Sequence, residues 1–135
     1  MIKWKDEYMI GVDKIDKQHQ ELFNITNKAY DLLDDEFVID KYDKIINIIE
    51  ELKEYTIFHF KEEEEYMLSI KYKRYFAQKV EHDEFVKKIN DVNLKDIDVD
   101  QKKYLTDLLE FVIDWISSHI LGSDKKITQK VVSIK

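Results

Sequence analysis

The four histidines of this chain are the residues whose types and spacing could do chemistry. His59 precedes Glu63 by four residues, and Gln78 precedes His82 by four. Residues four apart lie on the same face of a helix, one turn from each other. Imidazole and carboxylate together suit iron, zinc, copper or manganese, whereas magnesium and calcium prefer all-oxygen sites. The spacing therefore favours a transition-metal site carried by helices.

All four histidines fall on apolar stripes that are expected to face a core. A lone core histidine is more often packed and hydrogen-bonded than a ligand. Four histidines plus Glu63 without partners would each cost ~1–3 kcal/mol, and a shared metal centre would satisfy them together. These donors are too many for one tetrahedral zinc ion, so two metal ions bridged by carboxylate are the simpler count. The HExxH sequence of zinc peptidases and the Glu-x-x-His pairs of ferritin-like proteins are both absent.

Four amphipathic helices must position these side chains. Two glycines and no proline argue against a turn-rich β fold. Apolar residues at three- and four-residue steps, such as Leu105, Leu108 and Val112, predict helices over 16–34, 40–67, 73–90 and 100–121, each with one histidine. Asp16 and Asp40 are the expected N-caps, and Gly122 is the expected stop. The prediction is an all-α, antiparallel up-down-up-down four-helix bundle with an N-terminal arm, in a single domain over 1–135. Residues 91–99 form the longest expected loop, and 125–135 a short tail.

The composition excludes several other classes of protein. A net charge of −7 without a basic cluster argues against nucleic acid as a partner. The chain has no cysteine, which excludes disulfides and thiolate metal sites. It has no apolar run that approaches the ~18 residues of a membrane span, and no secretory signal at its start, so we expect a cytoplasmic protein.

The acidic run KEEEE at 61–65 divides into two groups. Glu62, Glu64 and Glu65 are expected on a solvated helix face. Glu63 differs because it continues the stripe of His59, and a buried carboxylate must be paired, protonated or bound to a metal.

Four blocks, in order along the chain, resemble the hemerythrins, particularly the single-domain bacterial and archaeal ones. The blocks are Trp4, Tyr8 and Gly11 with IDKQH ending at His19; HFKEEEEYM at 59–67; Tyr72 to Phe85; and WISSHILGSD at 115–124. The resemblance covers nearly the whole chain. It implies the same up-down-up-down four-helix bundle that the apolar stripes predict, since myohemerythrin is a well-known case of that architecture.

The resemblance implies a non-haem di-iron centre. One iron would take His19 and His59, and the other His82 and His119. Glu63, Asp124 and an oxo or hydroxo group would bridge the two ions. Asp124 lies five residues after His119, about 140° away on an ideal helix, so it can join the site only if the helix ends or loosens near Gly122.

Gln78 stands where the family has a third histidine for the second iron. Its amide oxygen could coordinate weakly, it could hold a water in the vacancy, or the second iron could bind poorly. An amide is a poorer donor to iron than imidazole, so we favour one of the first two outcomes, with a lowered metal affinity.

The resemblance also assigns an apolar pocket on the O2 side. Its residues would be Phe60, Trp115, Ile116 and Ile120. Simple core packing explains Ile116 and Ile120 equally well, whereas Trp115 lies one turn before His119 on the same face. A dry pocket would limit proton delivery to a bound ligand.

Reversible O2 binding for storage, delivery or sensing is the leading interpretation, with no enzymatic activity required. The alternative is a di-iron oxidase or peroxidase, or a nitric-oxide-handling protein, opened by the Gln78 vacancy. A third interpretation is a metal-loaded structural bundle without gas chemistry. The sequence leaves the protein partners and the oligomeric state open.

Overall fold

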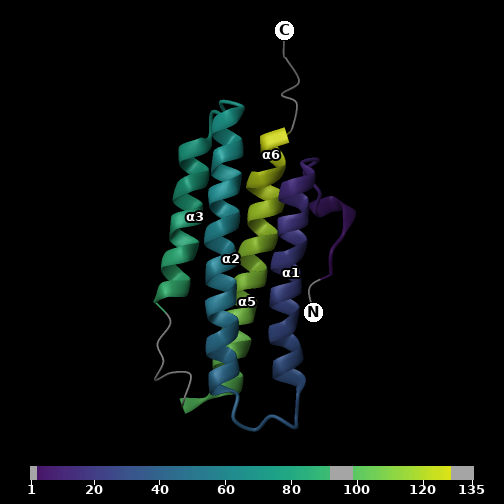
Figure 1. The fold of residues 1–135 in the computed structure, drawn as a ribbon, viewed down its shortest axis with the longest axis vertical. Coiled ribbons are helices and arrows are strands. Elements are labelled where there is room, and N and C mark those ends of the chain that lie inside the picture. Colours follow the sequence, from purple (N-terminus) through teal and green to yellow (C-terminus); the bar gives the residue numbers. More distant parts are fainter. Residues whose placement is uncertain (1–2, 92–98, 129–135) are drawn as a thin grey trace.

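The computed structural model describes residues 3–91 and 99–128, which form a bundle of four long helices. Figure 1 shows how these helices pack side by side. The long helices are α1 (Asp13–Asp34), α2 (Tyr42–Ser69), α3 (Tyr75–Asn90) and α5 (Gln101–His119). A 3-10 turn, η1 (Asp6–Tyr8), precedes them, and α5 runs on into a π turn, η2 (Ile120–Asp124), and the short helix α6 (Lys125–Thr128). The predicted all-α four-helix bundle is confirmed. Most of the predicted loop 91–99 and tail 125–135 lies outside the described residues.

The N-terminal arm is held by a residue that the sequence assigned to another task. The prediction of Asp16 as the N-cap of the first helix is wrong, because α1 begins at Asp13 after Val12. The buried Asp16 carboxylate instead accepts the backbone N–H groups of Ile10, at 2.8 Å, and Gly11, at 3.2 Å. Gly11 has φ +93°, a conformation that side chains disfavour. Asp16 therefore fixes the arm against α1.

Polar contacts join the starts of α2 and α5 at the end of the bundle that is drawn at the bottom of Figure 1, which we call the lower end. Lys41, rather than the predicted Asp40, is the N-cap residue of α2. The Asp40 carboxylate still accepts the backbone N–H of Tyr42 at 3.0 Å, and Gln101 donates to it at 3.0 Å. Asp100 caps α5 by accepting the Lys103 backbone N–H at 3.1 Å.

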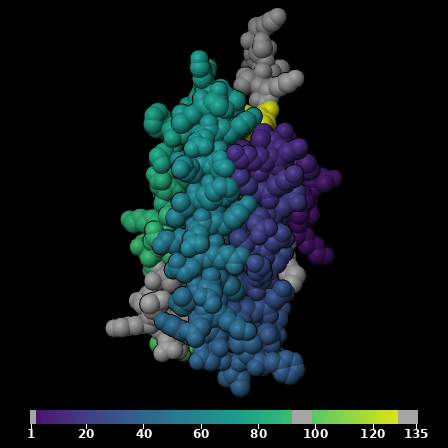
Figure 2. Space-filling view, viewed as in Figure 1, coloured from purple at the N-terminus to yellow at the C-terminus, as the bar shows by residue number. Residues whose placement is uncertain are grey.

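The core changes character along the bundle axis. Its lower half is aliphatic, with buried Ile45, Ile49, Leu105 and Leu109. Leu109 faces the core, whereas the predicted Leu108 is only half-buried. α1 packs along α2 and against α5, and α2 packs against α3. On the face of the molecule shown in Figure 2, side chains of α1 and α2 touch and cover the core.

The upper half of the core buries histidines and carboxylates among its apolar side chains, and the candidate functional site lies there. In the part of the chain that the structure describes, no helix is long and apolar enough to cross a membrane.

Candidate metal centre

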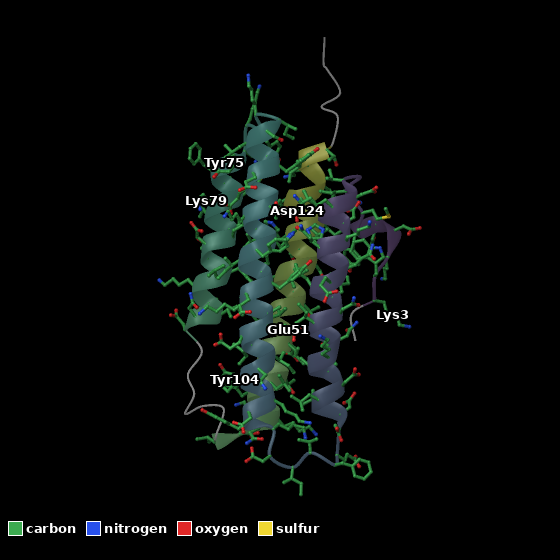
Figure 3. All side chains as sticks on the ribbon, in the orientation of Figure 1. Lys3, Glu51, Tyr75, Lys79, Tyr104 and Asp124 are labelled. Atoms are coloured by element: carbon green, nitrogen blue, oxygen red, sulfur yellow. The ribbon has the colours of Figure 1, made fainter. Side chains whose placement is uncertain are left out.

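Six buried side chains meet in the upper half of the bundle, and every long helix contributes to them. They are His19 from α1, His59 and Glu63 from α2, His82 from α3, His119 from α5 and Asp124 from η2. Figure 3 shows Asp124 near the level of Lys79 on α3, above Glu51 and Tyr104. The structure brings together all six residues that the sequence proposed as metal ligands.

The six side chains form two groups of four donors that share two carboxylates. In each group, one possible ligand atom per residue lies within 4.8 Å of the others. The groups are His19, His59, Glu63 and Asp124, and Glu63, His82, His119 and Asp124. Buried nitrogen and oxygen donors at this spacing are suitable ligands for two neighbouring metal ions. We call the first group site A and the second site B.

Each shared carboxylate turns one oxygen towards each site. Glu63 Oε2 lies 3.2 Å from His59 Nε2, and Glu63 Oε1 lies 3.1 Å from His82 Nε2. Asp124 Oδ2 lies 3.1 Å from His19 Nε2, and Asp124 Oδ1 lies 3.1 Å from His119 Nε2. A carboxylate with its two oxygens divided in this way can bridge two ions.

A π turn brings Asp124 into the cluster. The backbone N–H of Lys125 donates to the carbonyl of Ile120, five residues earlier, in place of the four-residue step of an α-helix. This wider turn removes most of the angular offset that would separate Asp124 from His119 on a regular helix. The loosening that the sequence required near Gly122 is therefore present. A Cβ added at Gly122 would meet nothing within 4 Å, so close packing does not demand glycine there.

Three of the four imidazoles donate their outer N–H to an oxygen that can only accept. The Nδ1 atoms lie 2.7 to 2.8 Å from these oxygens, and the pairs are His59 with the Gln18 amide oxygen, His82 with Glu64, and His119 with Glu81. These contacts place the proton on Nδ1. When these rings are neutral, each Nε2 atom therefore carries a lone pair that points into the cluster.

The inward lone pairs need a positive charge between them. The Nε2 atoms of His82 and His119 lie 3.0 Å apart, so two neutral rings would repel each other there unless a proton or a metal ion lies between them. Both ring nitrogens of His19, Glu63 Oε2 and Asp124 Oδ2 are buried without a hydrogen-bond partner among the described residues. Metal ions would satisfy these atoms at once, so the residues present fit a metal centre.

The pKa values of the cluster also favour added positive charge. Burial lowers the pKa of His19, but Asp124 and Glu63 outweigh it and raise that pKa to about 9. Burial acts likewise on His119, and the same two carboxylates raise its pKa to about 10. Burial raises the pKa of Glu63, yet its contacts with the four histidines hold it well below its usual range. For His59, burial prevails and lowers the pKa. Without metal, protons occupy part of the cluster.

Comparison with known proteins gives the family. Residues 10–131 match the family model of the hemerythrin HHE cation binding domain. The chain belongs to the hemerythrin family. It is 56% identical to a bacteriohemerythrin of Clostridium acetobutylicum over 126 residues, which cover 93% of this chain and 98% of the relative. It is 31% identical to a bacteriohemerythrin of Methylococcus capsulatus over 88% of this chain and 87% of the relative. A hemerythrin-like protein of Naegleria gruberi is 24% identical, over 91% of this chain and 87% of the relative.

Gln78 is buried beside site B of this hemerythrin chain. Its Nε2 atom donates to Asp124 Oδ1 at 3.3 Å. Its Oε1 atom has no hydrogen-bond partner among the described residues, although the side chain is only 3% exposed. An unpartnered buried amide oxygen fits either weak coordination or the holding of a water, the two outcomes that the sequence favoured.

A small cavity adjoins site A of the hemerythrin centre. All four residues predicted for the O2 pocket line it, together with Leu22, Thr56, Phe85 and the ligand candidates His19, His59, His119 and Asp124. The cavity volume in which the centre of a water molecule could lie is about 10 Å³, which is close to the minimum for holding one water molecule. Trp115 stacks on His119, with ring centroids 4.5 Å apart, and Phe60 stacks on His82 at 3.9 Å. The pocket therefore suits a very small ligand.

Sequence reasoning missed several residues that contact the cluster. It placed Glu64 on a solvated face, which is wrong, because the Glu64 side chain is 15% exposed and bonds to His82. Gln18, Glu81 and Thr56 were also missed. Glu81 bonds to His119 and Gln18 to His59, each on another helix, so their own positions in the sequence gave no signal for these contacts. Thr56 lies three residues before His59, and so shares its face.

Proposed function

We propose that this chain is a non-haem di-iron protein that binds O2 reversibly. The observation that carries the proposal is the pair of four-donor groups that share Glu63 and Asp124. Membership of the hemerythrin family and the likeness to bacteriohemerythrins support it. His19 and His59 would hold one iron, and His82 and His119 the other, with Gln78 in the remaining place at site B.

When bound, the two irons would supply the electrons and the binding position that O2 requires. The chain positions the ligands and restricts access to them. Phe60, Ile116 and Ile120 are nearly inaccessible to solvent and present hydrocarbon to the cavity. An apolar wall excludes water and slows proton delivery, which favours release of O2 intact over its reduction.

Storage, delivery and sensing of O2 all fall within this proposal, and a cytoplasmic location stays a prediction. A catalytic role is not part of it. The oxidase, peroxidase and nitric-oxide alternatives depend on a vacancy at Gln78, and they become outcomes of the test.

The test is a gas-exchange titration. The iron-loaded protein is reduced under inert gas, O2 is admitted, and the visible spectrum is followed while the gas is removed again. We expect an absorption band that appears with O2 and fades when O2 is withdrawn, over repeated cycles. Zinc-loaded protein is the control and should show no band. A permanent oxidised spectrum after the first cycle would contradict reversible binding and favour the redox alternatives.

A further inference from the structure

The two metal positions differ in what their histidines donate to. At site A, His59 donates to the neutral amide oxygen of Gln18 at 2.7 Å. The Nδ1 atom of His19 has no partner among the described residues. Among the described residues, neither imidazole of site A therefore donates its outer N–H to a charged acceptor.

At site B, both histidines donate to carboxylates. His82 Nδ1 lies 2.8 Å from Glu64 Oε2, and His119 Nδ1 lies 2.8 Å from Glu81 Oε2. Site B is also the position where Gln78 stands in place of an imidazole. The two charged acceptors are thus concentrated on the position where the resemblance to hemerythrins implies a third imidazole and this chain has an amide.

Both carboxylates are anchored on a second side. Ser123 donates to the two oxygens of Glu81, at 2.9 and 3.3 Å, and so ties α3 to the π turn that carries Asp124. Lys79 lies 3.4 Å from Glu64 Oε1. These contacts hold the carboxylates against the imidazoles, although the Glu81 side chain is 43% exposed.

A carboxylate on the outer N–H changes the imidazole as a ligand. The negative charge draws the Nδ1 proton towards itself, which leaves more electron density on Nε2 and strengthens its bond to a metal. An amide oxygen has the same effect to a smaller degree, because it carries no net charge. Substitution of such outer partners costs metalloproteins about 10–100-fold in metal affinity.

We propose that Glu64 and Glu81 are positioning residues that offset the missing imidazole at Gln78 and so retain the metal at site B. This inference rests on the proposed two-metal centre. In this chain the loss of one strong ligand is balanced by stronger donation from the two histidines that remain. The same pair of carboxylates is dispensable for site A.

The test measures metal binding in the absence of O2, with Zn²⁺ and Co²⁺ as probes. The double variant Glu64→Gln, Glu81→Gln keeps the shape of both side chains and the hydrogen-bond acceptor while it removes the charge. In competition with a chelator, we expect the native protein to bind two ions per chain. The double variant should keep one ion at native affinity and lose at least about tenfold in affinity for the other.

The matched control is Glu62→Gln, Glu84→Gln. These residues lie on the same two helices, and Glu62 pairs with Lys14 at the surface while Glu84 is exposed. Both ions should bind to this control with native affinity. The single variants Glu64→Gln and Glu81→Gln should each weaken one ion by less than the double variant does, which keeps the proposal testable if the double variant folds poorly.

A rescue assigns the weakened ion to site B. Addition of Gln78→His to the double variant restores an imidazole there, and the second ion should regain at least most of its native affinity. Equal weakening of both ions, unchanged binding, or no rescue by Gln78→His would each overturn the proposal, as would a native protein that binds a single ion. Because no O2 is involved, two-ion binding with this pattern stands even if the gas titration shows irreversible oxidation.

Discussion

The two ends of the bundle are built on opposite principles. At the lower end, α1, α2 and α5 meet through buried aliphatic side chains such as Ile45, Ile49 and Leu105. Each such side chain contributes about 1.5–3 kcal/mol by leaving water, with no ligand required. At the upper end these three helices and α3 bury six ionisable groups, which cost stability until a cation satisfies them. The lower end secures the fold, and its stability permits a polar site at the other end.

The change with the largest expected effect separates the two ends. Glu63→Ala removes the carboxylate that serves both metal positions, so we expect loss of both bound ions. The helical content should remain, because the aliphatic end is untouched. Metal analysis after gel filtration and circular dichroism measure the two effects. Glu62→Ala, one residue away on the surface, is the control and should bind both ions. Native metal content in Glu63→Ala would show that the shared carboxylate is not a ligand.

Removal of the metal should destabilise one end more than the other. We expect chelation to lower the melting temperature by at least several degrees, because the ions bind only to the folded chain. Hydrogen exchange should quicken around residues 116–124 and change little in residues 101–109 of the same helix. Equal acceleration in both segments would mean that the two ends do not differ in their dependence on metal.

The pH dependence of metal binding tests the charge of the histidines at the upper end. The metal-free chain has raised pKa values of about 9 at His19 and about 10 at His119, so both are protonated at pH 7. Metal binding at pH 7 should therefore release protons, and metal affinity should rise as the pH increases towards 9. In the metal-free chain, the stability that comes from protonated His119 is complete below pH 6.5 and is lost as the pH rises through about 10. Titration in weak buffer measures the released protons, and an affinity independent of pH would contradict this.

Two buried threonines provide the smallest and most local test. Thr26 donates its hydroxyl to the Leu22 carbonyl at 2.8 Å, whereas the Thr56 hydroxyl, beside the small cavity, has no partner among the described residues. In the metal-free protein, Thr26→Val should lower the free energy of unfolding by about 1 kcal/mol, and Thr56→Val should raise it by about 1 kcal/mol. Urea denaturation compares them. Equal destabilisation by both variants would show that Thr56 is satisfied in solution.

The sequence predicted what depends on helical period, and less of what depends on contacts between helices. Four stripes of apolar residues were sufficient for the bundle, and the histidines on them were sufficient for most of the cluster. Asp16 was assigned wrongly because its true partners belong to the arm rather than to its own helix. Glu64 was missed because the helical period turns it away from the buried face that carries Glu63 and towards solvent. The neighbouring α3 covers Glu64, however, and brings His82 to its carboxylate.

The π turn has a consequence for how ligands are found in sequences. On α2 the imidazole and its carboxylate are spaced four residues apart, as His59 and Glu63, whereas at the end of α5 the same pair is spaced five apart, as His119 and Asp124. A search that assumes one fixed pitch would accept the first pair and discard the second. The interval between two ligands thus records the local pitch of the backbone, and a spacing that looks wrong for a regular helix can itself mark a widened turn.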